Sequence, residues 1–192
     1  MTSGSIIGKA TRLVCVAVSV AALTACAIVA PPYSPDVDNI QALKNVPAAH
    51  AEVGTFESKT GATNPYPVPL RANMLRSPVG DSFGTYLADA MKQELTLAGR
   101  LSPQSGIEVK ATLLENTVDV GVANGEARLS ARFVVTRDGV VRYDQIKHTR
   151  TRWESSFAAY IAVPKAREEY PRAVQNLLGE LYADPAFQQA IQ

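Results

Sequence analysis

The chain has 192 residues, of which 19 are Lys or Arg and 18 are Asp or Glu, so its formal charge is close to zero. A balanced charge gives no support for a protein that binds nucleic acid in bulk. The chain has two cysteines and two histidines, too few for a disulfide framework and few for a metal site.

The N-terminal segment has the features of a signal peptide, which we predict over residues 1–25. Lys9 and Arg12 precede an apolar run from Leu13 to Leu23, and small residues follow it. The run has about 11 residues, whereas a helix needs about 20 to cross a bilayer. A basic segment, a short apolar core and small residues at its end are typical of a cleaved signal peptide.

The end of this segment resembles a bacterial lipobox, with the residues Leu23-Thr24-Ala25-Cys26. The resemblance implies cleavage before Cys26, a thioether lipid on its thiol and an acyl chain such as palmitate on its new amino group. Ala27 follows where inner-membrane retention signals carry Asp, which favours the periplasmic face of the outer membrane. An ordinary secretory signal with a chance cysteine, or an uncleaved anchor, are the alternatives. If the lipobox functions, the folded domain has no free thiol.

Residues 26–50 are predicted to be the lipidated cysteine and a flexible tether. This stretch is rich in Pro and Ala and shows neither a helical nor a strand period. A tether of this length would hold the domain about 25–30 Å from its anchor. A short turn packed against the domain, around Ile40 to Leu43, is the alternative.

Residues 51–192 are predicted to form a single α+β domain facing the periplasm. The expected order is β-α-β-β-β-α, a two-layer sandwich with an antiparallel sheet and two helices on one face. The expected elements are a strand at 51–56, a helix within 77–100, strands within 107–120, 125–139 and 140–156, and helices at 164–169 and 171–182. A proline-rich loop at 57–79 has no assigned role.

Local signals set several boundaries of these elements. Gly99 stands where a helix C-cap glycine belongs, and Ser77-Pro78 or Asp81 can begin the same helix. Asp138-Gly139 is a strong hairpin signal, because both central residues of a type I′ turn need positive φ. Asp184-Pro185 is typical of an N-cap followed by the first residue of a helix.

The candidate site is a set of cations on two neighbouring strands, with the one tryptophan near its end. It would form a positive stripe on the outer face of the sheet and bind an acidic partner, a lipid phosphate or a glycan. The alternative is a solvated face whose cations pair with Glu126, Asp144 or Glu154, and a tryptophan that packs in the core. The candidate residues are Arg128, Arg132, Lys147, Arg150, Arg152 and Trp153.

No metal-binding or cofactor-binding motif is present in the sequence. His50 and His148 lack the spacing of metal ligands, and no phosphate loop or dinucleotide fingerprint occurs. Glu168 and Glu169 are adjacent and so point in different directions on a helix. We therefore expect no metal, no cofactor and no enzymatic activity.

The segment at 77–101 resembles a helix of the YajG-like lipoproteins of proteobacteria, and the segment from Ala131 to Phe157 fits the same layout. The matched helix positions are Tyr86, Leu87, Ala90, Met91, Glu94, Leu95, Ala98 and Gly99. The resemblance implies an outer-membrane location and this fold, and it carries no catalytic residue. The predicted function is a non-enzymatic binding or assembly component of the cell envelope with a protein partner. An accessory lipid- or polysaccharide-binding lipoprotein of an envelope transport system is the alternative.

Overall fold

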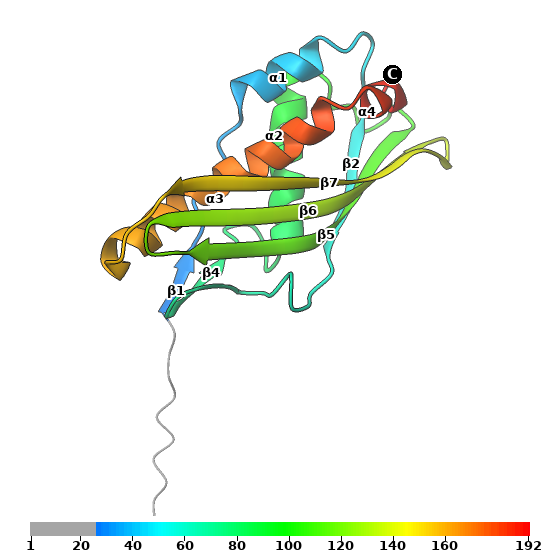
Figure 1. The fold of residues 1–192 in the computed structure, drawn as a ribbon. Helices are drawn as coiled ribbons and strands as arrows, with labels where there is room; N and C mark the ends of the chain where they lie inside the picture. Colours follow the sequence, from blue (N-terminus) through cyan, green and yellow to red (C-terminus); the bar gives the residue numbers. More distant parts are fainter. Residues whose placement is uncertain (1–25) are drawn as a thin grey trace, which may run out of the picture.

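The computed structural model describes residues 26–192, and the predicted signal peptide lies outside this range. Two sheets and four helices make up an α+β fold, as predicted, with the helices packed on one side of the larger sheet (Figure 1). The expected order of β-α-β-β-β-α is found in the larger sheet and its two long helices. A smaller sheet and two short helices add to it.

The larger sheet has four strands in the order β2-β5-β6-β7. These are β2 (Glu52–Ser58), β5 (Ile107–Val120), β6 (Asn124–Arg137) and β7 (Val140–Glu154). Strands β5, β6 and β7 form the antiparallel meander, whereas β2 pairs parallel with β5. The sheet is thus mixed rather than wholly antiparallel as predicted, because helix α2 crosses over between β2 and β5 and returns the chain in the same direction.

Strand alternation places the apolar residues of the meander under the helices. On β6 the side chains of Ala127, Leu129, Ala131, Phe133 and Val135 are all buried, as the sequence pattern predicts. The register between β5 and β6 shifts after Leu113, so a bulge changes which residues of β5 point inward. At the other hairpin, Asp138 and Gly139 have φ values of 50° and 79°, which confirms the predicted turn.

The helices follow their sequence signals with two exceptions. Helix α2 (Phe83–Ala98) ends at Gly99 in the left-handed region, but its N-cap is Ser82 rather than the predicted residues. Helix α3 (Ala159–Tyr182) continues through Pro164 and Pro171, so the predicted break is wrong. The helix packs on β5, β6 and β7, and it has buried side chains before Pro164, between the two prolines and after Pro171, which stabilise the helical path through both positions. Helix α4 (Pro185–Ala190) begins at the predicted Asp184 cap.

The prediction of a flexible tether over residues 26–50 is wrong, because this stretch is folded onto the domain. Strand β1 (Cys26–Val29) pairs with β4 (Asn73–Arg76), and β3 (Val68–Leu70) completes a three-stranded sheet. Helix α1 (Val37–Lys44) packs on α2 and α3. The apolar core includes Ala30, Tyr33 and Leu43, and the burial of these side chains stabilises the folded conformation of this stretch. The ordered domain therefore includes β1 and α1.

A buried carboxyl group holds this N-terminal segment to the helices. Glu94 of α2 is fully buried and accepts hydrogen bonds from the Tyr33 hydroxyl (2.6 Å), the Asp36 amide (3.0 Å) and the Asn39 amide group (3.2 Å). Asn39 also donates to the Gln175 carbonyl of α3. Burial raises the pKa of Glu94, and these hydrogen bonds offset part of that rise. Within residues 27–192, no cation lies within ion-pair distance of this carboxyl.

Candidate functional site

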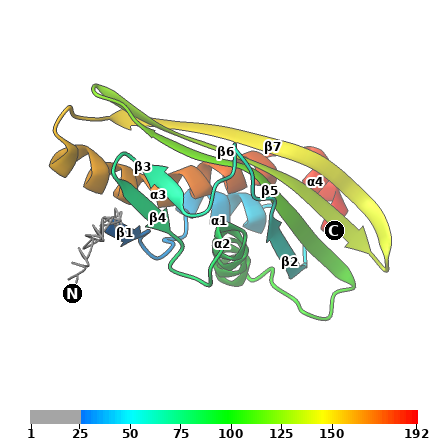
Figure 2. The ribbon, with the colours of Figure 1, turned by 90° about the horizontal axis from the view of Figure 1, so that it is seen from below.

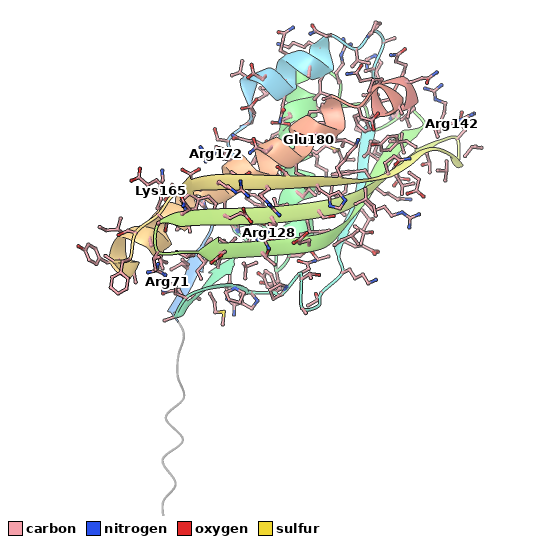
Figure 3. All side chains as sticks on the ribbon, in the orientation of Figure 1. Arg71, Arg128, Arg142, Lys165, Arg172 and Glu180 are labelled. Atoms are coloured by element: carbon pink, nitrogen blue, oxygen red, sulfur yellow. The ribbon has the colours of Figure 1, made fainter. Side chains whose placement is uncertain are left out.

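The outer face of the four-stranded sheet is the surface on which the sequence placed its candidate site. All four helices lie on the opposite face of the sheet (Figure 2). Side chains of Arg128 and Arg132 from β6, and of Arg150 and Arg152 from β7, point to this open side. Figure 3 shows Arg128 projecting from the middle of the sheet.

Three of these arginines gather around one carboxylate, and we call this group the Glu126 cluster. The Glu126 carboxylate lies 2.5 Å from Arg128 Nε, 2.7 Å from Arg152 Nε and 3.5 Å from Arg150 Nε. Glu126 is directly opposite Arg152, and Arg128 is directly opposite Arg150. Like charges in a directly opposed pair destabilise a sheet, so Glu126 compensates that contact from the neighbouring position.

The electrostatics of the Glu126 cluster favour an anionic partner. The hydrogen bond from Arg152, together with Arg128 and Arg150, holds the pKa of Glu126 below its ordinary value, so the carboxylate is charged at neutral pH. One negative charge then faces three positive charges, and the arginine side chains are about half exposed or more. The excess positive charge is available to a ligand that approaches the open face.

Arg132 shares the open face but has its own partner. Its guanidinium donates two parallel hydrogen bonds to Asp144, one of them 2.6 Å from Nε to Oδ1. This bidentate contact lowers the pKa of Asp144. Arg132 is therefore neutralised within the sheet, as the cross-strand alternative predicted.

Lys147 and Trp153 do not belong to this surface, so the prediction of one six-residue site is wrong for them. Successive residues of a strand point to opposite faces, and both of these residues point toward the helices. Lys147 donates to Asp184 at the cap of α4 (2.6 Å). Trp153 is 6% exposed and covers Gly125, where an added Cβ would lie 2.2 Å from the indole nitrogen. Trp153 therefore packs in the core, as the alternative interpretation predicted.

A groove beside the cluster was not predicted from the sequence. It has a volume of about 600 Å³ and runs between the end of β7 and the first half of α3. Arg152 contributes to it, together with Lys165 and Arg172 of α3, which both pair with Glu169 at 2.7 Å. The Arg172 guanidinium also donates to the Arg152 carbonyl. The signal available in the sequence was the helical spacing of Lys165, Glu169 and Arg172, which places all three on one side of α3.

A second, smaller hollow adjoins the cluster on the open face. Its volume is about 280 Å³, and it is lined by Glu115 of β5, Arg128 of β6, and His148 and Arg150 of β7. In the described part of the chain, no three His, Cys, Asp or Glu side chains gather as metal ligands would. Across residues 26–192, none of the helices combines the length and apolar character required to cross a bilayer.

Comparison with known proteins places the fold but not the activity. No family model matches the chain, and no curated protein matches it. The crystal structure of protein XCC0632 from Xanthomonas campestris, of the DUF330 family, is similar with a TM-score of 0.55 and 13% identity, over 86% of this chain and 97% of that one.

Two further solved structures have TM-scores of 0.46. One is a "putative lipoprotein" from Caulobacter crescentus CB15, at 14% identity over 80% of this chain and 96% of that one. The other is the hypothetical protein CT253 from Chlamydia trachomatis, at 13% identity over 70% of this chain and 94% of that one. At such identities the likeness concerns the fold alone, and the resemblance to YajG-like lipoproteins stays a prediction.

Proposed function

We propose that the chain is a lipid-anchored protein of the bacterial envelope that binds an acidic protein partner through the Glu126 cluster and catalyses no reaction. The lipid is attached at Cys26, and the domain faces the periplasm from the outer membrane. The lipobox-like residues before Cys26 support the anchor. The observation that carries the binding role is a sheet face without helices on which three arginines share one carboxylate.

The chemistry of the cluster determines the kind of partner. Arginine guanidinium groups bind carboxylates with paired hydrogen bonds, and those of Arg128, Arg150 and Arg152 stand on neighbouring strands. An open strand surface of this kind suits an extended acidic segment or an acidic sheet face better than a deeply enclosed small molecule. Contacts of exposed charges contribute mainly to specificity and to the rate of association.

The test uses a photo-crosslinking amino acid in the full chain, expressed in intact cells. Placed at His148, on the open face beside the cluster, it should capture a distinct protein whose recovery falls when Arg128 and Arg150 are both replaced by Glu. A crosslinker at Gln189, exposed on α4, is the positional control. Arg142→Glu changes an exposed cation outside the cluster and should leave capture unchanged. Capture of nothing at His148, or capture that is unaffected by the double replacement, refutes the proposal.

A lipid- or polysaccharide-binding role is the second candidate, and the groove between β7 and α3 favours it. Arg152, Lys165 and Arg172 give this groove cations on both walls, and its volume of about 600 Å³ can hold a phosphorylated headgroup or sugar. Binding of the purified protein to anionic phospholipid vesicles or to lipopolysaccharide should then weaken with salt. If Lys165→Glu and Arg172→Glu leave that binding unchanged, this role is excluded.

A further inference from the structure

We infer that the end of the domain where β1 starts rests in the interfacial layer of the membrane, with Phe157 and Tyr160 inserted between the lipid headgroups. We call this region the anchor end. The inference rests on the proposed attachment at Cys26 and adds a second, non-covalent contact with the bilayer.

One arginine connects the segments that meet at the anchor end. Arg71 lies in the turn before β4, two residues from Asn73, which pairs with Cys26 of β1. Its guanidinium donates to the Phe157 carbonyl (2.9 Å) and to the Gly121 carbonyl (3.2 Å). The first residue of β1, the β5–β6 hairpin and the loop before α3 therefore lie together, and Figure 3 places Arg71 beside the start of β1.

A further contact joins β1 to the first half of α3. The Arg167 Nε donates to the Val29 carbonyl over 2.6 Å. The loop before α3 and the first turns of this helix are thus held beside the strand that begins at Cys26. The position of the aromatic residues relative to the attachment point is fixed by these hydrogen bonds.

Several large apolar side chains are exposed to solvent at the anchor end. Phe157 is 83% exposed and Tyr160 81% exposed, and Val122 at the hairpin tip is 64% exposed. Ile161 adds a further half-exposed side chain. A cluster of exposed apolar residues marks an interaction site, and aromatic rings favour the headgroup level of a bilayer.

The path of the chain identifies the bilayer as what covers this surface. Ala27 is already paired with Met74 in the small sheet, so no flexible residues separate Cys26 from the folded domain. Lipid chains on Cys26 would enter the membrane at the anchor end itself and hold the domain against the headgroups. An uncleaved apolar segment would leave the domain at the same point, so both forms of attachment bring the same residues to the membrane.

Two contacts of different kinds also suit the energetics of membrane attachment. Lipid chains attach the protein firmly, but an attachment at one residue leaves the domain free to rotate relative to the membrane. Insertion of Phe157 and Tyr160, which lie on a different segment from Cys26, removes that freedom. The orientation of the Glu126 cluster relative to the membrane is then defined, which a partner in a fixed assembly requires.

The test measures the depth of single positions in the full, processed chain reconstituted in phospholipid vesicles. An environment-sensitive fluorophore is attached to Phe157→Cys, and separately to Val140→Cys, which is exposed at the opposite hairpin as a matched control. We expect quenching by lipid-borne quenchers to be several-fold stronger at position 157 than at 140. Replacing Tyr160 by Ser should reduce the quenching at 157 without lowering the melting temperature, because this side chain is 81% exposed.

Three outcomes separate this inference from the function on which it rests. Equal, weak quenching at 157 and 140 in vesicle-bound protein with a lipidated Cys26 overturns the inference alone. If the fluorophore at position 157 reports a buried environment even without lipid, and the protein has the mass of a dimer, the inference is also overturned. A second copy of the chain then covers the surface. A bare Cys26 thiol, visible by mass and by its own labelling, contradicts the proposed anchor instead.

Discussion

Replacing Glu94 by Ala should release the N-terminal segment from the domain. The substitution removes the acceptor for the Tyr33 hydroxyl and the Asp36 amide, while Asn39 keeps its bond to Gln175. Each buried donor left without a partner costs about 1–3 kcal/mol. Part of this loss is offset, because the variant no longer bears the desolvation cost of a buried carboxyl group. We therefore expect the free energy of unfolding to fall by about 2–4 kcal/mol.

The loss should be concentrated in one part of the fold. Hydrogen exchange in α1, around Ile40, should become much faster in Glu94→Ala, because its attachment to α2 and α3 is weakened. Exchange in β5 and β6 should change only as far as global stability does. Uniform loss of protection through the whole domain, or unchanged protection in α1, would refute the reasoning.

Glu94→Gln separates hydrogen bonding from ionisation. The amide oxygen can still accept from Tyr33 and Asp36, and the amide nitrogen can donate toward the hydroxyl of Tyr182, which lies beside Glu94. Because burial raises the pKa of Glu94, the native state binds the proton more tightly than the unfolded state. The protonated Glu94 carboxyl therefore contributes fully to stability below the pKa that it has in the unfolded state. This contribution is lost as the pH rises through its higher pKa in the native state. Urea unfolding from pH 4 to 8 should show the wild type losing stability relative to Glu94→Gln as the pH rises. A wild type that gains stability relative to Glu94→Gln over this range contradicts the reasoning.

Three further substitutions test other parts of the account. Gly125→Ala should destabilise the domain by about 1–3 kcal/mol, since its Cβ would collide with Trp153, and thermal melting measures this. Glu126→Gln should lower the melting temperature at pH 7, with the difference disappearing in acid: Arg152 depresses the pKa of Glu126, so the contribution is present above the ordinary glutamate pKa and lost as pH falls through the depressed one. Asp184→Ala should cost about 1–2 kcal/mol through loss of the α4 cap and of the bonds from Tyr143 and Lys147, measured by urea unfolding with Asp184→Asn as the milder variant. If Asp184→Ala melts like the wild type, α4 is not held in place by this carboxylate.

The sequence was informative wherever a local signal determined the structure. Alternation on β6 identified both the buried residues and the outward Arg128, and Gly99 and Asp138-Gly139 marked an end and a turn that depend on positive φ. Local signals also limited the site prediction. Alternation along β7 places Lys147 and Arg150 on opposite faces, so their closeness in sequence did not make them neighbours on one surface.

The order of residues 26–50 could not be predicted because its causes are distant in sequence. Asp36 caps α1 through its own side chain, but the partner of Tyr33 and Asn39 is Glu94, more than 50 residues away. A glutamate in the middle of an otherwise apolar helix face was the one visible hint of a buried polar contact. The proline-rich stretch that forms β3 and β4 is likewise ordered by partners in β1 and β5.

Mass analysis of the mature N-terminal peptide, from protein expressed in a proteobacterial host, tests the central claim most directly. The account predicts that the peptide begins at Cys26 and carries a thioether-linked lipid together with an acyl chain on its amino group. A peptide that begins at any other residue, or a Cys26 whose thiol is free, would contradict the anchored protein and the membrane-bound end that depends on it.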